Sequence, residues 1–286
     1  MNVYQNNKLQ QLGNQYKLDI LDGGDARVGP EWEARDLCPS FSRIYYILQG
    51  EGLLRLEQET VRLTPGSVYV IPAGLKFSHS CDNYMHQVYF HIHIFHKSGL
   101  DLLRGGGRIH CRKEEPEKLK KVQQLYHSQR PEDAFELLGI LWTEIAAYAA
   151  ENDICQQFNR PYSPLVEEVF YLAQNPVNVK NHPSTLADAL HVSVSTLSKR
   201  FRQETGISIG AYLKQLVINR ACYLLHTEES SVAQIARELG FEDPFYFAKY
   251  FKNLVARSPS SYRKKIKQGY FPCLIQCHAA RAALLC

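Results

Sequence analysis

The sequence lacks long hydrophobic runs. None of its apolar stretches approaches the ~18–20 residues that a membrane-spanning helix needs. The N-terminal stretch is polar, with Asn2, Gln5 and Lys8, so we expect no secretory signal. The eight cysteines are scattered, and without such a signal they are expected to be reduced thiols. These absences predict a cytoplasmic protein that binds no membrane.

Charge is divided unevenly along the chain. From Pro161 onward, 15 Lys and Arg stand against 9 Asp and Glu, a net charge of about +6. Up to Arg160 the corresponding numbers are 18 and 20, a net charge of about −2. A basic half joined to a slightly acidic half is typical of a DNA-binding part linked to a part with another role.

The N-terminal half is predicted to form short strands. Between Phe41 and Phe95, β-branched and aromatic runs alternate with Gly/Pro turns, a pattern that favours a small antiparallel barrel or sandwich. After Gly105–Gly107 the pattern becomes helical over residues 114–128 and 131–152, with Pro131 in a first turn. The period is lost over 153–163, which is therefore predicted to be a linker.

Two stretches near the C-terminus are predicted to form helix-turn-helix units, Leu186–Phe201 and Val232–Phe251. Each combines a short apolar helix, a tight turn and a second helix with polar and basic residues between apolar anchors. They start about 45 residues apart, and a long amphipathic helix over 210–226 joins them. Two such units in tandem are typical of a protein that reads DNA.

Several residues are predicted to mark the ends of these helices. Ser163 can cap a helix that runs to Gln174, Ser184 can cap 185–190, and Ser193 or Ser195 can cap the helix after the first turn. Helix-ending glycines are expected at 206 and 240. Pro244 fits the first turn of the second helix of the second unit.

The C-terminal segments resemble the AraC/XylS family of bacterial transcription regulators. Gly240–Lys252 followed by Ser258–Arg263 is similar to the family's signature over its second helix-turn-helix unit. Leu197–Gly206 and Tyr212–Leu225 resemble its first unit and linker helix.

The N-terminal half resembles the cupin-type ligand barrel of the AraC subgroup, over Tyr45–Gly52 and Leu63–Gly74. The expected fold is therefore α+β, with a small antiparallel, cupin-like barrel plus helices, and an all-α domain with two helix-turn-helix units. The expected boundaries are an effector-binding barrel over 1–112, a helical dimerisation segment over 113–152, a linker over 153–163, a DNA-binding domain over 164–268, and an unassigned tail over 269–286.

The side chains predicted to contact DNA lie on the second helix of each unit. Leu197 with Phe201, and Phe247 with Phe251, are four residues apart and are expected to pack inward. The remaining face of each helix then points outward, with Ser195, Thr196, Ser198, Lys199 and Arg202 on the first. The resemblance implies that Ser195, Ser198 and Lys199 read bases, and an aromatic side chain of the second unit could touch a thymine methyl group. A solvated helix face that binds nothing is the alternative. The predicted DNA-contacting residues are Ser195, Thr196, Ser198, Lys199, Arg202, Phe245, Tyr246, Lys249 and Lys252.

Polar and aromatic residues of the barrel could line an effector pocket. The resemblance implies a small effector, a sugar, with Arg43 and His79 bonding hydroxyls and Trp32 or Tyr45 stacking on a sugar face. For each histidine, a purely structural role is the alternative. The predicted effector-binding residues are Trp32, Arg43, Tyr45, His79, His91 and His93.

No metal, cofactor or catalytic residue is expected. Metal-binding cupins pair a His-x-His on an early strand with a later histidine, whereas Ser42–Tyr45 contains no histidine, and His91 and His93 lie on the last strand. Cys273, Cys277 and His278 could suggest a zinc site, but two more ligands are not evident at the usual spacings. The chain is thus predicted not to be an enzyme. A cupin-type enzyme and an effector-independent regulator, whose barrel only dimerises, are the alternatives.

The helix predicted over Pro131–Asn152 carries an apolar stripe that either packs on the barrel or forms a dimer contact, as the resemblance implies. The expected partners are double-stranded DNA, a small-molecule effector, a second copy of the chain and RNA polymerase. An effector would act by binding the DNA-competent and DNA-incompetent arrangements with different affinity. The stripe consists of Leu137, Leu138, Leu141, Ile145 and Tyr148.

Overall fold

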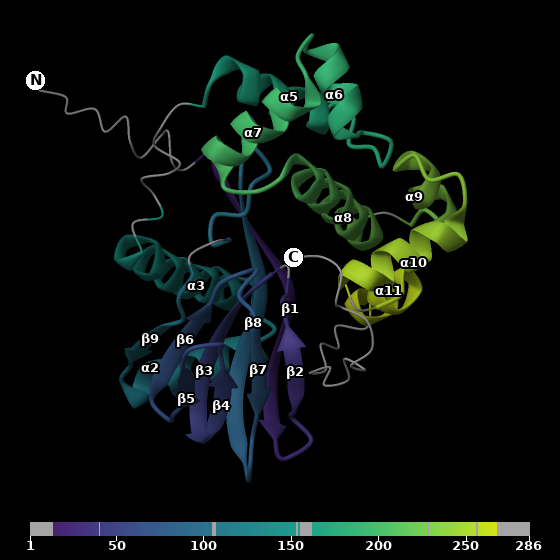
Figure 1. The fold of residues 1–286 in the computed structure, drawn as a ribbon. Coiled ribbons are helices and arrows are strands. Elements are labelled where there is room, and N and C mark those ends of the chain that lie inside the picture. Colours follow the sequence, from purple (N-terminus) through teal and green to yellow (C-terminus); the bar gives the residue numbers. More distant parts are fainter. Residues whose placement is uncertain are drawn as a thin grey trace, which may run out of the picture. The chain divides into compact units, whose positions relative to one another are not determined.

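The computed structural model describes residues 14–39, 41–104, 107–152, 154, 162–227, 229–255 and 257–267 (Figure 1). The predicted tail and most of the predicted linker lie outside these residues. The chain divides into two compact units. Among the described residues, the barrel unit contains those of 18–94 and 101–154, and the helical unit contains those of 14–17, 95–100 and 162–267.

The barrel unit consists of two β-sheets, as the strand runs predicted. One has five strands in the order β1-β8-β3-β6-β9, and the other has four in the order β2-β7-β4-β5. The central strand β3 is antiparallel to β6 and β8, and Tyr45 lies opposite Tyr69 and Tyr89. The strands are β1 (Tyr16–Val28), β2 (Ala34–Leu37), β3 (Ser42–Gly50), β4 (Gly52–Arg55), β5 (Thr60–Leu63), β6 (Ser67–Ile71), β7 (Phe77–Ser80), β8 (Met85–His96) and β9 (His110–Lys113).

Alternate residues of β3 face opposite sides of the five-stranded sheet, because side chains along a strand alternate. Tyr45 and Ile47 join the core between the sheets, with Trp32 and Phe77. Tyr46 points to the other face, where its ring meets Phe90 edge-on at 6.2 Å. Two helices cover this outer face, α2 (Pro116–His127) on β3 and α3 (Pro131–Glu151) on β6.

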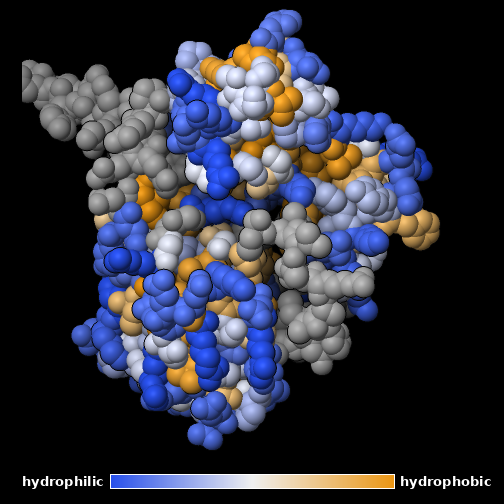
Figure 2. Space-filling view, in the orientation of Figure 1, coloured by the Kyte–Doolittle hydropathy of each residue, from blue (hydrophilic) through white to orange (hydrophobic). Residues whose placement is uncertain are grey.

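The apolar stripe predicted on α3 is largely used within the barrel unit. Leu141, Ile145 and Tyr148 are buried, while Leu137 and Leu138 are half-buried. A second row on the same helix, which includes Phe135 and Trp142, stays exposed. Hydrophilic residues predominate on the visible face of each unit, as expected where apolar residues gather inside (Figure 2).

The helical unit is organised around one long helix, α8 (Ile209–Thr227), which contacts helices from both helix-turn-helix segments (Figure 1). Phe170, Phe201 and Tyr212 pack ring against ring on one part of it. Phe247 and Phe251 belong to a second buried cluster, which α8 shares with the C-terminal helices. The other helices are α5 (Pro164–Gln174), α6 (Pro183–Ala189), α7 (Val194–Thr205), α9 (Val232–Glu238), α10 (Pro244–Val255) and α11 (Pro259–Lys267).

Two of the predicted helix caps need correction. The prediction that Ser184 caps α6 is wrong, because the cap is His182, whose ring nitrogen accepts a hydrogen bond from the Ser184 backbone. Ser163 does stand at the start of α5, but its hydroxyl donates to Glu204 at 2.8 Å instead of capping. Ser193 and Gly206 lie at the ends of α7 as predicted.

Candidate DNA-reading surface and effector site

The helix-turn-helix segments α6–α7 and α9–α10 repeat the same backbone hydrogen bonds. In the first turn, the Val192 amide donates to the Ala187 carbonyl at 3.0 Å. In the second, the Phe241 amide donates to the Ala236 carbonyl at 2.9 Å. The two turns therefore have matching geometry, but the second has one more residue before its second helix, so positions on the second helices are compared by their buried anchors Leu197 and Phe247.

Each turn passes through one residue with a left-handed backbone. In the second turn this residue is Gly240, with φ 82°, and a side chain there would overlap Asn178. In the first turn the corresponding residue is His191, with φ 54°. A left-handed backbone is costly for residues with a Cβ, so His191 stores strain that Gly240 avoids.

The second helix of each segment, α7 in the first and α10 in the second, is called its reading helix below. Each reading helix begins with a side chain that caps its exposed amides. The Ser193 hydroxyl accepts from the Thr196 amide at 3.1 Å, and the Asp243 carboxylate accepts from the amides of Phe245 and Tyr246 at 2.9 and 3.1 Å. Such caps hold the first turn rigid, and the first turn is the part of a recognition helix that meets base edges.

Apolar anchors on each reading helix determine which side chains face outward. Leu197 and Phe201 on α7, and Phe247 and Phe251 on α10, are fully buried. Of the nine residues predicted to contact DNA, eight are exposed and Ser198 is half-buried. The hydroxyls of Ser195 and Thr196 lie within 2.9 and 2.8 Å of the Ser193 hydroxyl, so part of their hydrogen-bonding capacity serves the cap.

The exposed cations on the reading helices differ in their partners. Arg200 is held by Glu204 four residues later, with 2.6 Å between Nε and Oε1. Within the described part of the chain, Lys199 and Lys249 form no ion pair. These two lysines hold equivalent positions, two residues after Leu197 and Phe247 respectively. Each reading helix therefore presents one lysine at the same place.

Four of the six predicted effector residues, Trp32, Arg43, Tyr45 and His79, lie at the core between the two sheets of the barrel unit. The rings of Trp32 and His79 are 4.0 Å apart, and Tyr45 lies 6.4 Å from Trp32. The Arg43 side chain is buried, and its guanidinium lies 5.2 Å from the ring centre of Phe77. A cation over an aromatic ring is held by the ring's negative face.

His79 is uncharged at neutral pH. Burial, and next the positive charge of Arg43, lower the pKa of His79 to about 4. Its Nδ1 atom is buried and has no hydrogen-bond partner among the described residues. An unsatisfied buried nitrogen of this kind is costly unless a ligand or water satisfies it.

The remaining two histidines have different surroundings. His91 stands 3.6 Å from Asp22, and its ring packs on Phe41 at 4.7 Å. The Nδ1 atom of His93 lies 2.6 Å from Oδ2 of Asp101, and this contact within the protein holds the His93 ring in place. The sequence pattern did not single out Asp22, Phe41 or Phe77, because strand partners far apart in the chain bring them to the site.

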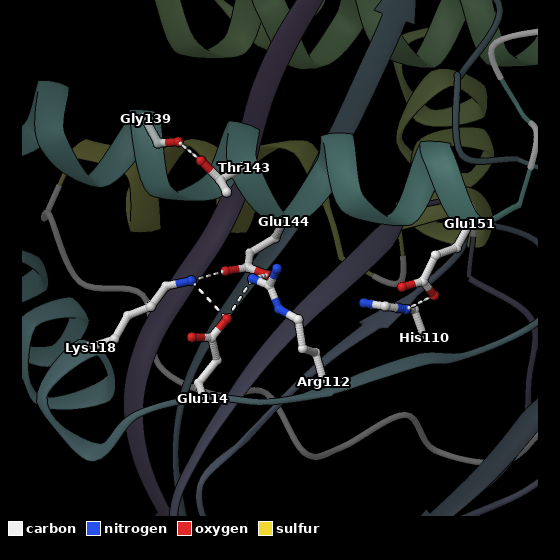
Figure 3. A network of polar contacts seen from close by, with 8 residues as sticks. All are labelled: His110, Arg112, Glu114, Lys118, Gly139, Thr143, Glu144 and Glu151. Atoms are coloured by element: carbon white, nitrogen blue, oxygen red, sulfur yellow. Dashed lines mark hydrogen bonds and ion pairs between the residues drawn. The ribbon is translucent and has the colours of Figure 1, made fainter.

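A buried ion network holds α3 on the five-stranded sheet (Figure 3). The Glu144 carboxylate, which is 0% exposed, accepts from Arg112 at 2.7 Å and from Lys118 at 2.9 Å. Glu114 contacts the same two cations, at 2.5 and 2.9 Å. Two positive and two negative charges therefore balance beneath the helix.

In the residues that the structure describes, no group of three His, Cys, Asp or Glu side chains is placed to hold a metal ion. Over the same residues, no helix is both long and apolar enough to cross a membrane.

A tandem helix-turn-helix unit together with a barrel unit defines a class of ligand-responsive DNA-binding regulators. Family models match both parts, an AraC-like ligand binding domain over residues 30–154 and a helix-turn-helix domain over 186–265. The chain belongs to the AraC family of transcription regulators, and the resemblance seen in the sequence is confirmed.

Individual relatives agree with this assignment. The chain is 27% identical over 236 residues to the Msm operon regulatory protein of Streptococcus mutans, which covers 79% of this chain and 85% of the relative. It is 30% identical over 129 residues to the arabinose operon regulatory protein of Escherichia coli, which covers 45% and 44%. Among solved structures, a ToxT variant from Vibrio cholerae has a TM-score of 0.52 at 16% identity and covers 88% of this chain and 98% of its own. That likeness shows the fold.

Proposed function

We propose that α7 and α10 read base edges in two successive turns of the major groove, about 34 Å apart along the DNA. The observation that carries this proposal is the matched geometry of the two segments, each with a capped first turn and one outward lysine. Lys199 and Lys249 would donate to guanine edges. Arg202 and Lys252, one turn further along, would contact phosphates.

Removing both lysines tests this assignment. A Lys199→Ala, Lys249→Ala double variant should bind its selected DNA site about 100-fold more weakly, because each lost base contact costs ~1–3 kcal/mol. The control is Lys76→Ala with Lys120→Ala, which removes the same charge from exposed positions of the barrel unit. Unchanged footprints in the first variant would show that these helices do not read the DNA.

We propose that the barrel unit binds a small polar effector, a sugar. Support comes from the buried side chains of Arg43 and His79 and from the ring of Trp32, which lies 4.0 Å from the His79 ring. This combination suits hydroxyls and a sugar face. One relative is named for the arabinose operon. A sugar that binds the folded state should raise the melting temperature in a concentration-dependent way.

The effector proposal is tested with a thermal-shift panel of pentoses, hexoses and disaccharides. The sugar that shifts wild type should lose that shift in Arg43→Ala, while DNA affinity without sugar stays unchanged. Arg55→Ala, which removes an exposed arginine from the other sheet, is the control. A normal shift in the Arg43 variant would remove this residue from the pocket.

We further propose that two copies of the chain associate through the exposed row of α3 that includes Phe135 and Trp142. The buried stripe of the same helix is occupied by the barrel, so this second row is the apolar surface that remains for a partner. Sedimentation of the full chain tests it, and a monomer at micromolar concentration would contradict it.

Transcription in vitro from a promoter with the selected site would then test the expected action on RNA polymerase.

A further inference from the structure

The two reading helices differ chemically at their first turn. Aligned on the buried anchors Leu197 and Phe247, position two of the helix is Ser195 in α7 and Phe245 in α10. The next position is Thr196 in α7 and Tyr246 in α10, whereas the lysine one turn later is the same in both. The first segment therefore offers hydroxyls where the second offers aromatic rings.

Phe245 projects fully from the surface. It is 84% exposed, the largest exposed fraction among the large apolar side chains of the described residues. Tyr246 is 58% exposed, but its ring leans against the buried Phe241 at 5.9 Å. Single exposed apolar residues are common on proteins, so the exposure alone proves nothing. The place of Phe245 matters, because it stands on the capped first turn that enters the groove.

A phenyl ring in the major groove can match only one base edge well. It offers no hydrogen bond, so it would leave the donors and acceptors of guanine, cytosine or adenine without partners. Thymine alone presents an apolar group there, its 5-methyl group. Lys249, four residues after Phe245, lies on the same helix face, so a ring placed against a thymine would bring this lysine close to a neighbouring base or phosphate.

We propose that Phe245 is a specificity-determining residue that selects thymine by its 5-methyl group in the half-site read by α10. The half-site read by α7 is selected by hydrogen bonds instead. This inference rests on the proposed role of α10 as a reading helix. One methyl group buried against the ring corresponds to about a fourfold change in affinity.

The test removes the methyl group from the DNA and the ring from the protein. A binding site is first selected from random-sequence duplexes with the full chain, and each thymine is then replaced by deoxyuridine, which differs only by that methyl group. At one or two positions, deoxyuridine should weaken binding of wild type about fourfold. In Phe245→Ser, which copies Ser195 of the first segment, the same replacement should have no effect. Phe245→Leu should keep part of the sensitivity.

Tyr171→Ser is the matched control, because Tyr171 is also highly exposed, at 62%, but lies on α5, outside the two reading helices. It should retain the full deoxyuridine effect. Equal wild-type affinity for every deoxyuridine duplex would overturn the inference while leaving DNA binding intact, and so would an effect that persists in Phe245→Ser. Failure to select any duplex would instead overturn the role of the reading helices, and this inference with it.

Discussion

Replacing the buried carboxylate of Glu144 should destabilise the barrel unit selectively. Glu144→Gln keeps the size of the side chain but removes the charge that Arg112 and Lys118 contact at 2.7 and 2.9 Å. Hydrogen bonds to charged groups contribute ~1.5–3 kcal/mol each, and breaking a buried ion pair costs ~3–5 kcal/mol. Both cations keep Glu114 as a partner, and their side chains are 33% and 26% exposed. We therefore expect Glu144→Gln to lower the free energy of unfolding of the barrel unit by about 3 kcal/mol, the lower end of the range for a broken buried ion pair.

Tryptophan fluorescence provides a selective assay. The chain has two tryptophans, Trp32 and Trp142, and both belong to the barrel unit. With a urea dependence of roughly 2 kcal/mol per M, the loss of about 3 kcal/mol should lower the unfolding midpoint by about 1.5 M. The free energy of unfolding of the helical unit, followed by circular dichroism, should change little.

Glu136→Gln is the matched control for this experiment. Glu136 lies on the same helix and pairs with Lys121, but its side chain is 45% exposed. Surface pairs contribute about 0–1 kcal/mol, so the midpoint should move by less than about 0.5 M. An equally small shift for Glu144→Gln would refute the reasoning, because it would mean that Glu114 and solvent satisfy both cations.

Two further predictions concern the turns and the barrel interior. Gly240→Ala should lower the free energy of unfolding of the helical unit by about 1–3 kcal/mol, while His191→Gly should raise it by about 0.5–1 kcal/mol, because only the second change relieves a left-handed backbone. Thermal melts that show the same sign for both would contradict this. The lowered pKa of His79 means that the unfolded state takes up a proton first, so the free energy of unfolding should fall as pH drops from about 6.5 to about 4, by up to ~3 kcal/mol. His79→Gln should flatten that part of the pH profile, and an unchanged slope would contradict the assignment.

The helix-turn-helix segments could be predicted well because their signals are local. The spacing of Leu197 and Phe201 marks a buried helix face, and Gly206 marks the end of the helix, within a single stretch of sequence. The strand β6, Ser67–Ile71, likewise has a local signal, because it is a β-branched and aromatic run within the predicted strand region and turn residues flank it on both sides.

Other strands were not predicted from the sequence. β1 alternates apolar and polar residues only over Tyr16–Ile20, before adjacent glycines and aspartates interrupt the pattern, and β9 reads His-Cys-Arg-Lys. β9 becomes a strand because it pairs with β6, where Cys111 lies opposite Tyr69. Pairing partners far along the chain decide such cases.

By itself, the sequence determined the family, the two reading helices and the outward positions on them, since each depends on residues a few positions apart. The tertiary structure alone decided that the Glu144 carboxylate is buried and that the His93 ring pairs with the Asp101 carboxylate. It also decided that Arg43 and His79 lie close together inside the barrel unit. Burial and charge pairing depend on segments that meet only in the folded chain. For the same reason, the apolar stripe of α3 was visible in the sequence, but the surface on which it packs was not.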